Sequence, residues 1–131
     1  KRQSLYLIYK NKRWIMFQID MEFVHGMLFV RLEGVLSKRT SKELNEVLDR
    51  MIHVHGVRYF VINLEDLSFL DEEGVSVIMS HYHDIVLHDG RLIVCGDRSH
   101  LNQKVADELD QALPDVERSS DELSAFRLMH I

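Results

Sequence analysis

Residues 63–74, Asn-Leu-Glu-Asp-Leu-Ser-Phe-Leu-Asp-Glu-Glu-Gly, join an apolar strand pattern to a helical pattern. The carboxylates of Asp71, Glu72 and Glu73 stand where the helix is expected to begin. A helix N-terminus has unpaired backbone N–H groups and a partial positive charge, so it attracts anions. Because acidic side chains already fill that place, the segment is not expected to hold a phosphate. It is predicted instead to form a charged surface that a partner reads.

The residues before this segment predict a hairpin and a helix. Ile19–Val24 and Met27–Leu32 are short strand-like runs, and His25-Gly26 between them suits a two-residue turn. Gly34 is expected to end the second run. Thr40-Ser41-Lys42-Glu43 has the form of a capping box, which opens a helix. Apolar residues follow it at helical spacing: Leu44, Val47, Leu48, Met51 and Ile52.

The remaining chain alternates strand and helix patterns. Val57–Leu64 and Arg91–Cys95 are apolar runs typical of strands covered on both faces. Between them, an apolar stripe at helical spacing follows residue 74. Ser99 is expected to cap a third helix, and Ser119-Ser120-Asp121-Glu122 a fourth, after a short strand at Val116–Arg118. The order predicts an α/β fold: a mixed, mostly parallel sheet with an N-terminal hairpin and about four helices.

Composition is that of one soluble globular domain. The chain has 131 residues, 46% of them hydrophobic and 28% charged. Its single cysteine, Cys95, excludes a disulfide framework and fits a reducing compartment, so a cytoplasmic location is expected. Within its apolar run, Cys95 is predicted to be a small buried side chain. No apolar run approaches the ~20 residues of a membrane span.

Charge is distributed unevenly along the chain. Residues 1–15 carry five basic side chains and no acidic one, which leaves a formal charge of −10 on residues 16–131. So acidic a body is unsuited to bind nucleic acid directly. A disordered or loosely attached basic extension is favoured for residues 1–15, over an arm that binds a membrane surface or a partner. The folded domain is expected to comprise residues 16–131.

Signals of catalysis, cofactor binding and metal binding are weak. The chain has no Gly-x-Gly-x-x-Gly fingerprint, Walker loop or Gly-x-Ser-x-Gly elbow. His53/His55 and His81/His83 are spaced by two, which places the members of each pair on different faces of a helix. No metal site is therefore expected, and the histidines are assigned to solvated or helix-end positions. Because neighbouring helical residues diverge by ~100°, adjacent carboxylates at the helix start cannot readily share one substrate.

The acidic residues have simple structural roles available to them. Asp71 suits the N-cap of the helix, and Glu72 and Glu73 complement its dipole. Those roles leave the neighbouring pattern unexplained. Leu67, Phe69 and Leu70 bring large apolar side chains into the segment. Gly74 stands where alanine would give a better helix by ~1 kcal/mol, and is expected to let another backbone approach closely.

The segment Asn63–Asp71 followed by Gly74, within this order of elements, resembles the STAS domain of bacterial anti-sigma factor antagonists. The resemblance runs from about Met16 to near the C-terminus. Arg31-Leu32-x-Gly34 and Gly90-x-Leu92-x-Val94-Cys95 add to it. It implies a STAS fold and a binding protein without catalysis of its own. Its partner would be an anti-sigma factor, typically an ATP-using protein kinase, whose capture liberates a sigma factor and so regulates transcription.

The sequence departs from this family at the residue that the kinase would modify. The family motif reads Asp-Ser-Ser-Gly or Asp-x-Ser/Thr-Gly, whereas this chain has Asp71-Glu72-Glu73-Gly74. Glu73 takes the phosphoacceptor position and has no hydroxyl. Ser68 and Ser76 are nearby but do not match that position. Two interpretations stay open: Glu73 mimics the phosphorylated state, or the partner has co-adapted and binding is constitutive.

A second departure lies in the loop at Ser37-Lys38-Arg39, where the family often has an acidic residue near Ser37. This loop is expected beside the helix start. Two alternatives follow. Lys38 or Arg39 would screen the charges of Glu72 and Glu73, or the basic and acidic residues together would form a partner surface with a changed charge pattern. The predicted partner-binding residues are Ser37, Lys38, Arg39, Ser68, Asp71, Glu72, Glu73 and Gly74. The alternative function is a STAS interaction module of a scaffold or transport complex.

Overall fold

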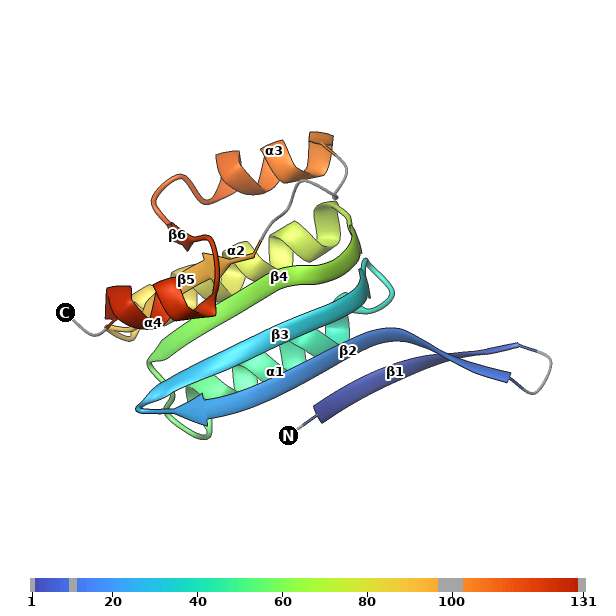
Figure 1. The fold of residues 1–131 in the computed structure, drawn as a ribbon, viewed down its shortest axis with the longest axis horizontal. Helices are drawn as coiled ribbons and strands as arrows, with labels where there is room; N and C mark the ends of the chain where they lie inside the picture. Colours follow the sequence, from blue (N-terminus) through green and yellow to red (C-terminus); the bar gives the residue numbers. More distant parts are fainter. Residues whose placement is uncertain (1, 10–11, 97–102, 130–131) are drawn as a thin grey trace.

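A computed structural model describes residues 2–9, 12–96 and 103–129 of the chain. The described residues form one six-stranded sheet in sequential order and four α-helices. In chain order the elements are β1 Arg2–Tyr9, β2 Lys12–Val24, β3 Met27–Leu36, α1 Ser41–His53, β4 Tyr59–Leu70, α2 Glu72–Leu87, β5 Arg91–Cys95, α3 Gln103–Ala112, β6 Glu117–Ser119 and α4 Glu122–Met129. Figure 1 shows their arrangement.

The sheet is mixed, as predicted. β1, β2 and β3 pair antiparallel, and β3, β4, β5 and β6 pair parallel. The predicted hairpin is confirmed and is longer than expected. His25 and Gly26 both have positive φ, 50° and 82°, which matches the right-handed twist of the flanking strands. The expected break at Gly34 is wrong: Gly34 lies within β3 at φ 94°, where a side chain would collide with the Met16 carbonyl oxygen.

The N-terminal segment differs from the expected loose extension. Residues 2–9 form β1, which pairs with β2 from Arg2 opposite Asp20 to Tyr9 opposite Lys12. β2 starts at Lys12, so the boundary predicted after residue 15 falls inside a strand. The N-terminal half of β2 offers unpaired N–H and C=O groups, which a neighbouring strand satisfies. Figure 1 shows this ribbon reaching beyond the rest of the sheet.

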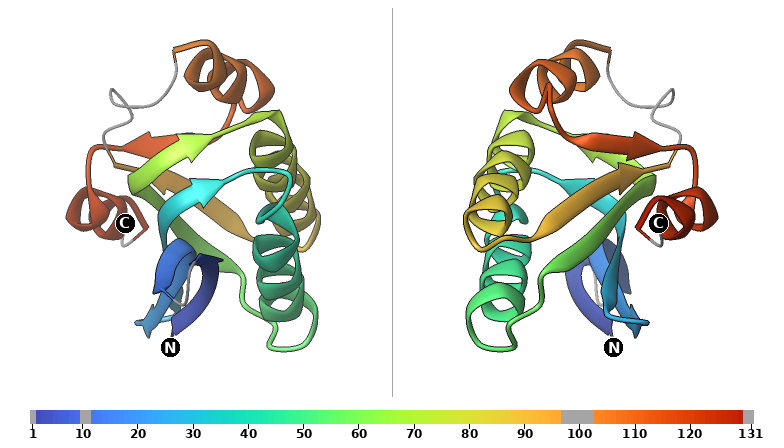
Figure 2. Two further views of the ribbon diagram at one scale, coloured as in Figure 1. Left: turned by 90° about the vertical axis from the view of Figure 1, so that its right-hand side faces the viewer. Right: turned by 90° about the vertical axis from the view of Figure 1, so that its left-hand side faces the viewer.

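Helices cover both faces of the sheet. Figure 2 shows α1 and α2 together on one face, α4 on the other, and α3 beyond one edge. The predicted stripe of α1 is confirmed, since all five of its apolar residues are buried against the sheet. A smaller core beneath α4 holds Ala125 of that helix and residues from the opposite face of β3, β4 and β5: Met27, Phe29, Val61, Ile93 and Cys95. The central strands are therefore apolar on both faces.

Both predicted capping boxes are wrong. The Thr40 hydroxyl donates to the Val35 carbonyl oxygen at 2.6 Å and accepts from the Ser37 N–H at 2.9 Å, so it does not cap α1. At α4, Asp121 takes the role given to Ser119, because its Oδ1 accepts from the Ser124 N–H at 2.8 Å. A local sequence pattern cannot show which hydroxyl groups will form hydrogen bonds with residues outside the helix. The Ser99 cap lies outside the described residues.

An ion pair fastens α4 to the sheet. Arg31 of β3 donates to both carboxylate oxygens of Glu122, at 2.8 Å each, and Asn63 of β4 donates to Oε2 at 2.9 Å. The hydrogen bonds from Arg31 hold the pKa of Glu122 below its usual range. Glu122 therefore ties the last helix to two central strands.

Candidate functional site

The acidic segment lies where β4 ends and α2 begins. Asp71 is the N-cap of α2, as predicted: its backbone is extended, and its Oδ1 accepts from the Gly74 N–H at 3.0 Å. Its Oδ2 accepts from the Lys38 N–H at 3.1 Å. The loop between β3 and α1 therefore lies beside the helix start, as expected. One carboxylate fixes both segments.

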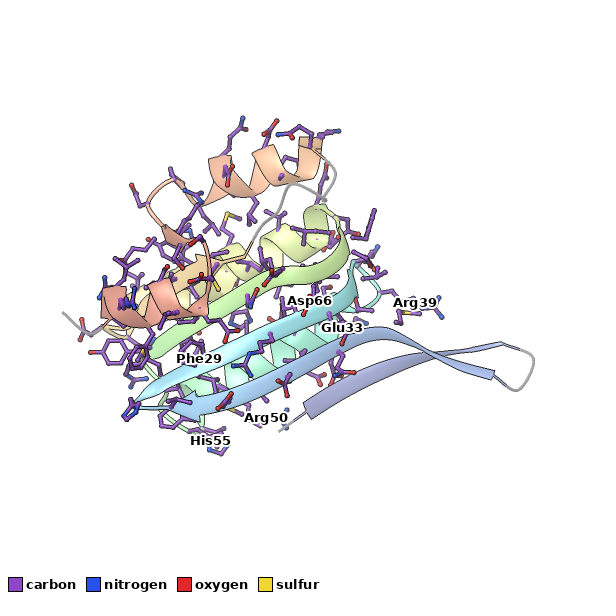
Figure 3. The ribbon with its side chains drawn as sticks, viewed as in Figure 1. Phe29, Glu33, Arg39, Arg50, His55 and Asp66 are labelled. Carbon is purple, nitrogen blue, oxygen red and sulfur yellow. The ribbon has the colours of Figure 1, made fainter. Side chains whose placement is uncertain are left out.

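The loop itself is a tight turn that presents two basic side chains. The Ser37 carbonyl oxygen accepts from the Thr40 N–H at 3.0 Å and from the Ser41 N–H at 2.7 Å. Ser37 is half-buried in this turn, while Lys38 and Arg39 are exposed. Figure 3 shows Arg39 at the end of the sheet, pointing away from the ribbon.

Glu72 and Glu73 are exposed in the first turn of α2. Among the described residues, neither forms an ion pair with Lys38 or Arg39. Lys38 and Arg39 therefore do not screen Glu72 and Glu73 through a direct ion pair. Lys38 and the acidic residues instead line one open surface, and the other alternative, that this surface has a changed charge pattern for a partner, stays a prediction.

That surface is hollowed into an open groove of about 400 Å³. Its lining comes from the loop, the start of α2 and helix α3: Lys38, Asp71, Glu72, Glu73, Lys104 and Glu108. We call these six residues the recognition groove. Sequence reasoning missed Lys104 and Glu108, because only the fold brings α3 to the start of α2. Their i,i+4 spacing on one helix face was the available signal.

Gly74 lies under the groove and is buried. A Cβ there would come within 2.7 Å of Leu70 Cδ1 and 2.9 Å of Leu36 Cγ. The close approach expected at this glycine is thus made by the chain's own β3 and β4 ends. Contact between Gly74 and a partner stays a prediction.

The apolar residues of the segment divide between core and surface, and a register shift between β3 and β4, with Gly34 opposite Leu67 and Val35 opposite Phe69, interrupts the strand alternation here. Leu67 and Leu70 are buried in the core, whereas Phe69 is 43% exposed at the end of β4. Ser68 is also exposed, and its Oγ donates to the Gly34 carbonyl oxygen at 3.0 Å. Ser68 is not among the residues that line the recognition groove, and its contact with a partner stays a prediction.

The structure also shows where a predicted histidine and the cysteine lie. His81 is buried, contrary to the expected solvated position, with Nε2 2.8 Å from Asn45 Oδ1; burial lowers its pKa. Cys95 is buried as predicted, and burial raises the pKa of its thiol to about 12. Such a thiol is inert in exchange chemistry. Among the described residues, no helix is long and apolar enough to cross a membrane.

Comparison with known proteins gives a consistent result. The STAS domain family model matches residues 18–112. An anti-sigma F factor antagonist from Paenibacillus polymyxa is 36% identical over 78 residues, which cover 60% of this chain and 67% of that protein. Unphosphorylated SpoIIAA has a similar structure (TM-score 0.70, 18% identity), with 86% of this chain and 99% of that one covered. Phosphorylated SpoIIAA from Bacillus gives a TM-score of 0.65 at 19% identity, covering 84% and 98%.

Proposed function

This chain belongs to the STAS domain family, and we propose that it acts as an anti-sigma factor antagonist. In this proposal the recognition groove binds an anti-sigma factor of the ATP-binding kinase type and thereby releases a sigma factor. This binding requires no catalytic activity of the chain itself. The similarity to the Paenibacillus polymyxa antagonist supports the class of function.

The observation that carries the proposal is the construction of the α2 start. Asp71 holds the loop and the helix together through two backbone N–H groups, at 3.0 and 3.1 Å. Around it, the described residues that line the groove carry charges of both signs, and Phe69, two residues before Asp71, is also exposed. Fixed charges of both signs are suited to selecting one protein partner, since complementary charge chiefly sets specificity and association rate.

Because Glu73 has no hydroxyl, this surface cannot be switched by phosphorylation at the family's phosphoacceptor position. A phosphoserine carries about −1.5 to −2 charges and can be removed, whereas a carboxylate carries one permanent charge. Glu73 is exposed beside Lys38 in the recognition groove, so its charge faces any bound partner. Binding would then be controlled by the amount of protein, or would be held permanently in the state that a phosphate gives to relatives.

Affinity capture of the full chain from its source cells tests this function. The expected result is recovery of an ATP-binding anti-sigma factor. The variant Lys38→Glu/Arg39→Glu should weaken that complex, and Lys42→Glu, on the exposed side of α1, provides the matched control. Equal recovery with all three proteins would contradict the role of the groove.

The second candidate is an interaction module in a scaffold or transport complex. The missing hydroxyl at Glu73 favours it, because such a module needs no kinase-operated release. Recovery of transporter or scaffold subunits, with no anti-sigma factor, would establish this function in place of the first.

A further inference from the structure

A second cluster of polar residues lies away from the recognition groove, on the helix pair that covers one face of the sheet (Figure 2). Each helix carries an aspartate four residues before a histidine: Asp49 and His53 lie on α1, and Asp84 of α2 precedes His88 at the C-cap of that helix. A spacing of four puts both members of a pair on one helix face. This spacing of four pairs each histidine with an aspartate, whereas the histidine pairs in the sequence are spaced by two.

The two helix faces bring three ligand atoms together. His53 Nε2 lies 2.8 Å from Asp84 Oδ2 and 3.7 Å from Asp49 Oδ1. All three ligand atoms lie within 4.8 Å of one another. Zinc binds nitrogen and oxygen at about 2.0–2.2 Å, so the ligands of a tetrahedral ion are roughly 3.4 Å apart. The cluster thus needs shifts of only about an ångström to surround an ion.

The charges of the cluster suit a divalent cation. Asp49 and Asp84 place two carboxylates around one imidazole, and a divalent ion balances two negative charges. The side chains of Asp49, His53 and Asp84 are 64%, 42% and 27% exposed, so an ion can enter from solvent. Three protein ligands leave one coordination position to water.

His88, the C-cap residue of α2, supports the ligand that α2 supplies. Its Nδ1 lies 2.8 Å from the Asp84 carbonyl oxygen and 3.2 Å from Asp84 Oδ1. A carbonyl oxygen only accepts, so Nδ1 carries a hydrogen and donates it to the Asp84 carbonyl oxygen, which holds the imidazole against the Asp84 carboxylate. Oδ2 of Asp84 is left facing His53. His88 is in this way a positioning residue, of the kind that orients metal-binding carboxylates.

We propose that Asp49, His53 and Asp84 bind a divalent transition-metal ion of the zinc class, with His88 orienting Asp84. The imidazole distinguishes this site from one for magnesium or calcium, which prefer oxygen ligands alone. A bound ion would join the C-terminal turns of α1 and α2, because its ligands come from both helices.

Isothermal titration of the full, tag-free, chelator-treated chain with Zn²⁺ tests the site. Wild-type protein should bind one ion saturably, and excess Mg²⁺ should not compete. His53→Ala and Asp49→Asn should abolish this binding, and His88→Ala should weaken it by about 10- to 100-fold. Asp49 is exposed, so its variant is expected to fold. His83→Ala, which removes an exposed histidine of α2 outside the cluster, should leave binding unchanged.

Circular dichroism of each variant establishes that it is folded before titration. Thermal unfolding gives a second measurement: Zn²⁺ should raise the Tm of the wild type and of His83→Ala, but not that of Asp49→Asn. Absence of saturable binding to the wild type would overturn the proposal and leave the cluster as an ion pair between helices. Equal binding by wild type and Asp49→Asn would overturn it in favour of adventitious binding elsewhere.

Discussion

Replacing Asp71 with alanine tests how the recognition surface is held in place. The change removes the N-cap bond to Gly74 and the bond from the Lys38 N–H, at 3.0 and 3.1 Å. Loss of an N-cap costs about 1 kcal/mol, and a hydrogen bond contributes about 0.5–1.5 kcal/mol. The free energy of unfolding should therefore fall by roughly 2 kcal/mol, which for a domain of this size lowers Tm by roughly 6–8 °C.

Urea unfolding followed by circular dichroism measures this loss, and Asp71→Asn is the matched control. The asparagine side-chain oxygen can still accept from Gly74, and asparagine is as good an N-cap as aspartate. We expect the asparagine variant to retain at least half of the unfolding free energy that the alanine variant loses. If the alanine variant stays within about 0.5 kcal/mol of wild type, as an ordinary surface change would, Asp71 does not fix the loop to α2.

Three further predictions concern the core and the sheet. Gly74→Ala should lower the free energy of unfolding by about 1–2 kcal/mol in urea titrations, because the clash with Leu70 and Leu36 exceeds the ~1 kcal/mol of added helix propensity; a more stable variant would contradict this packing. Glu122 has a pKa lowered by Arg31, so its contribution is full above the carboxyl's usual value near 4.5 and is lost as pH falls through the lower folded-state pKa. The stability difference between wild type and Glu122→Gln should accordingly shrink in acid unfolding curves, and a constant difference would refute the pairing. Native Cys95 should resist a thiol reagent at pH 8 and react once unfolded, since burial raises its pKa to about 12; rapid native labelling would show that the thiol is accessible.

The elements could be predicted from sequence because their patterns are local. The apolar run before residue 63 is nearly continuous, as in a strand covered on both faces, whereas the stripe after residue 74 recurs at helical spacing, and this difference marks the change from β4 to α2. The Asp71 N-cap follows from the same local logic. The α/β order and the mixed sheet then follow from how such elements pack.

The features that were missed depend on residues far apart in the chain. The pairing of β1 depends on the length of β2, and its basic charges instead suggested a loose tail. The Thr40 hydroxyl donates to the Val35 carbonyl oxygen and does not cap the start of α1. Lys104 reaches the recognition groove only because α3 lies over the start of α2. No local pattern contains these contacts.

The central claim is that this chain keeps a recognition surface for an anti-sigma factor but has lost the phosphorylation switch at Glu73. The most direct measurement combines the purified anti-sigma factor, ATP and either wild-type protein or Glu73→Ser, and follows both phosphate incorporation and survival of the complex. Wild-type protein should take up no phosphate and its complex should be unaffected by ATP, whereas the serine variant should be phosphorylated and its complex should dissociate. Phosphorylation of the wild type at Ser68 or Ser76, with dissociation of its complex, would contradict the account.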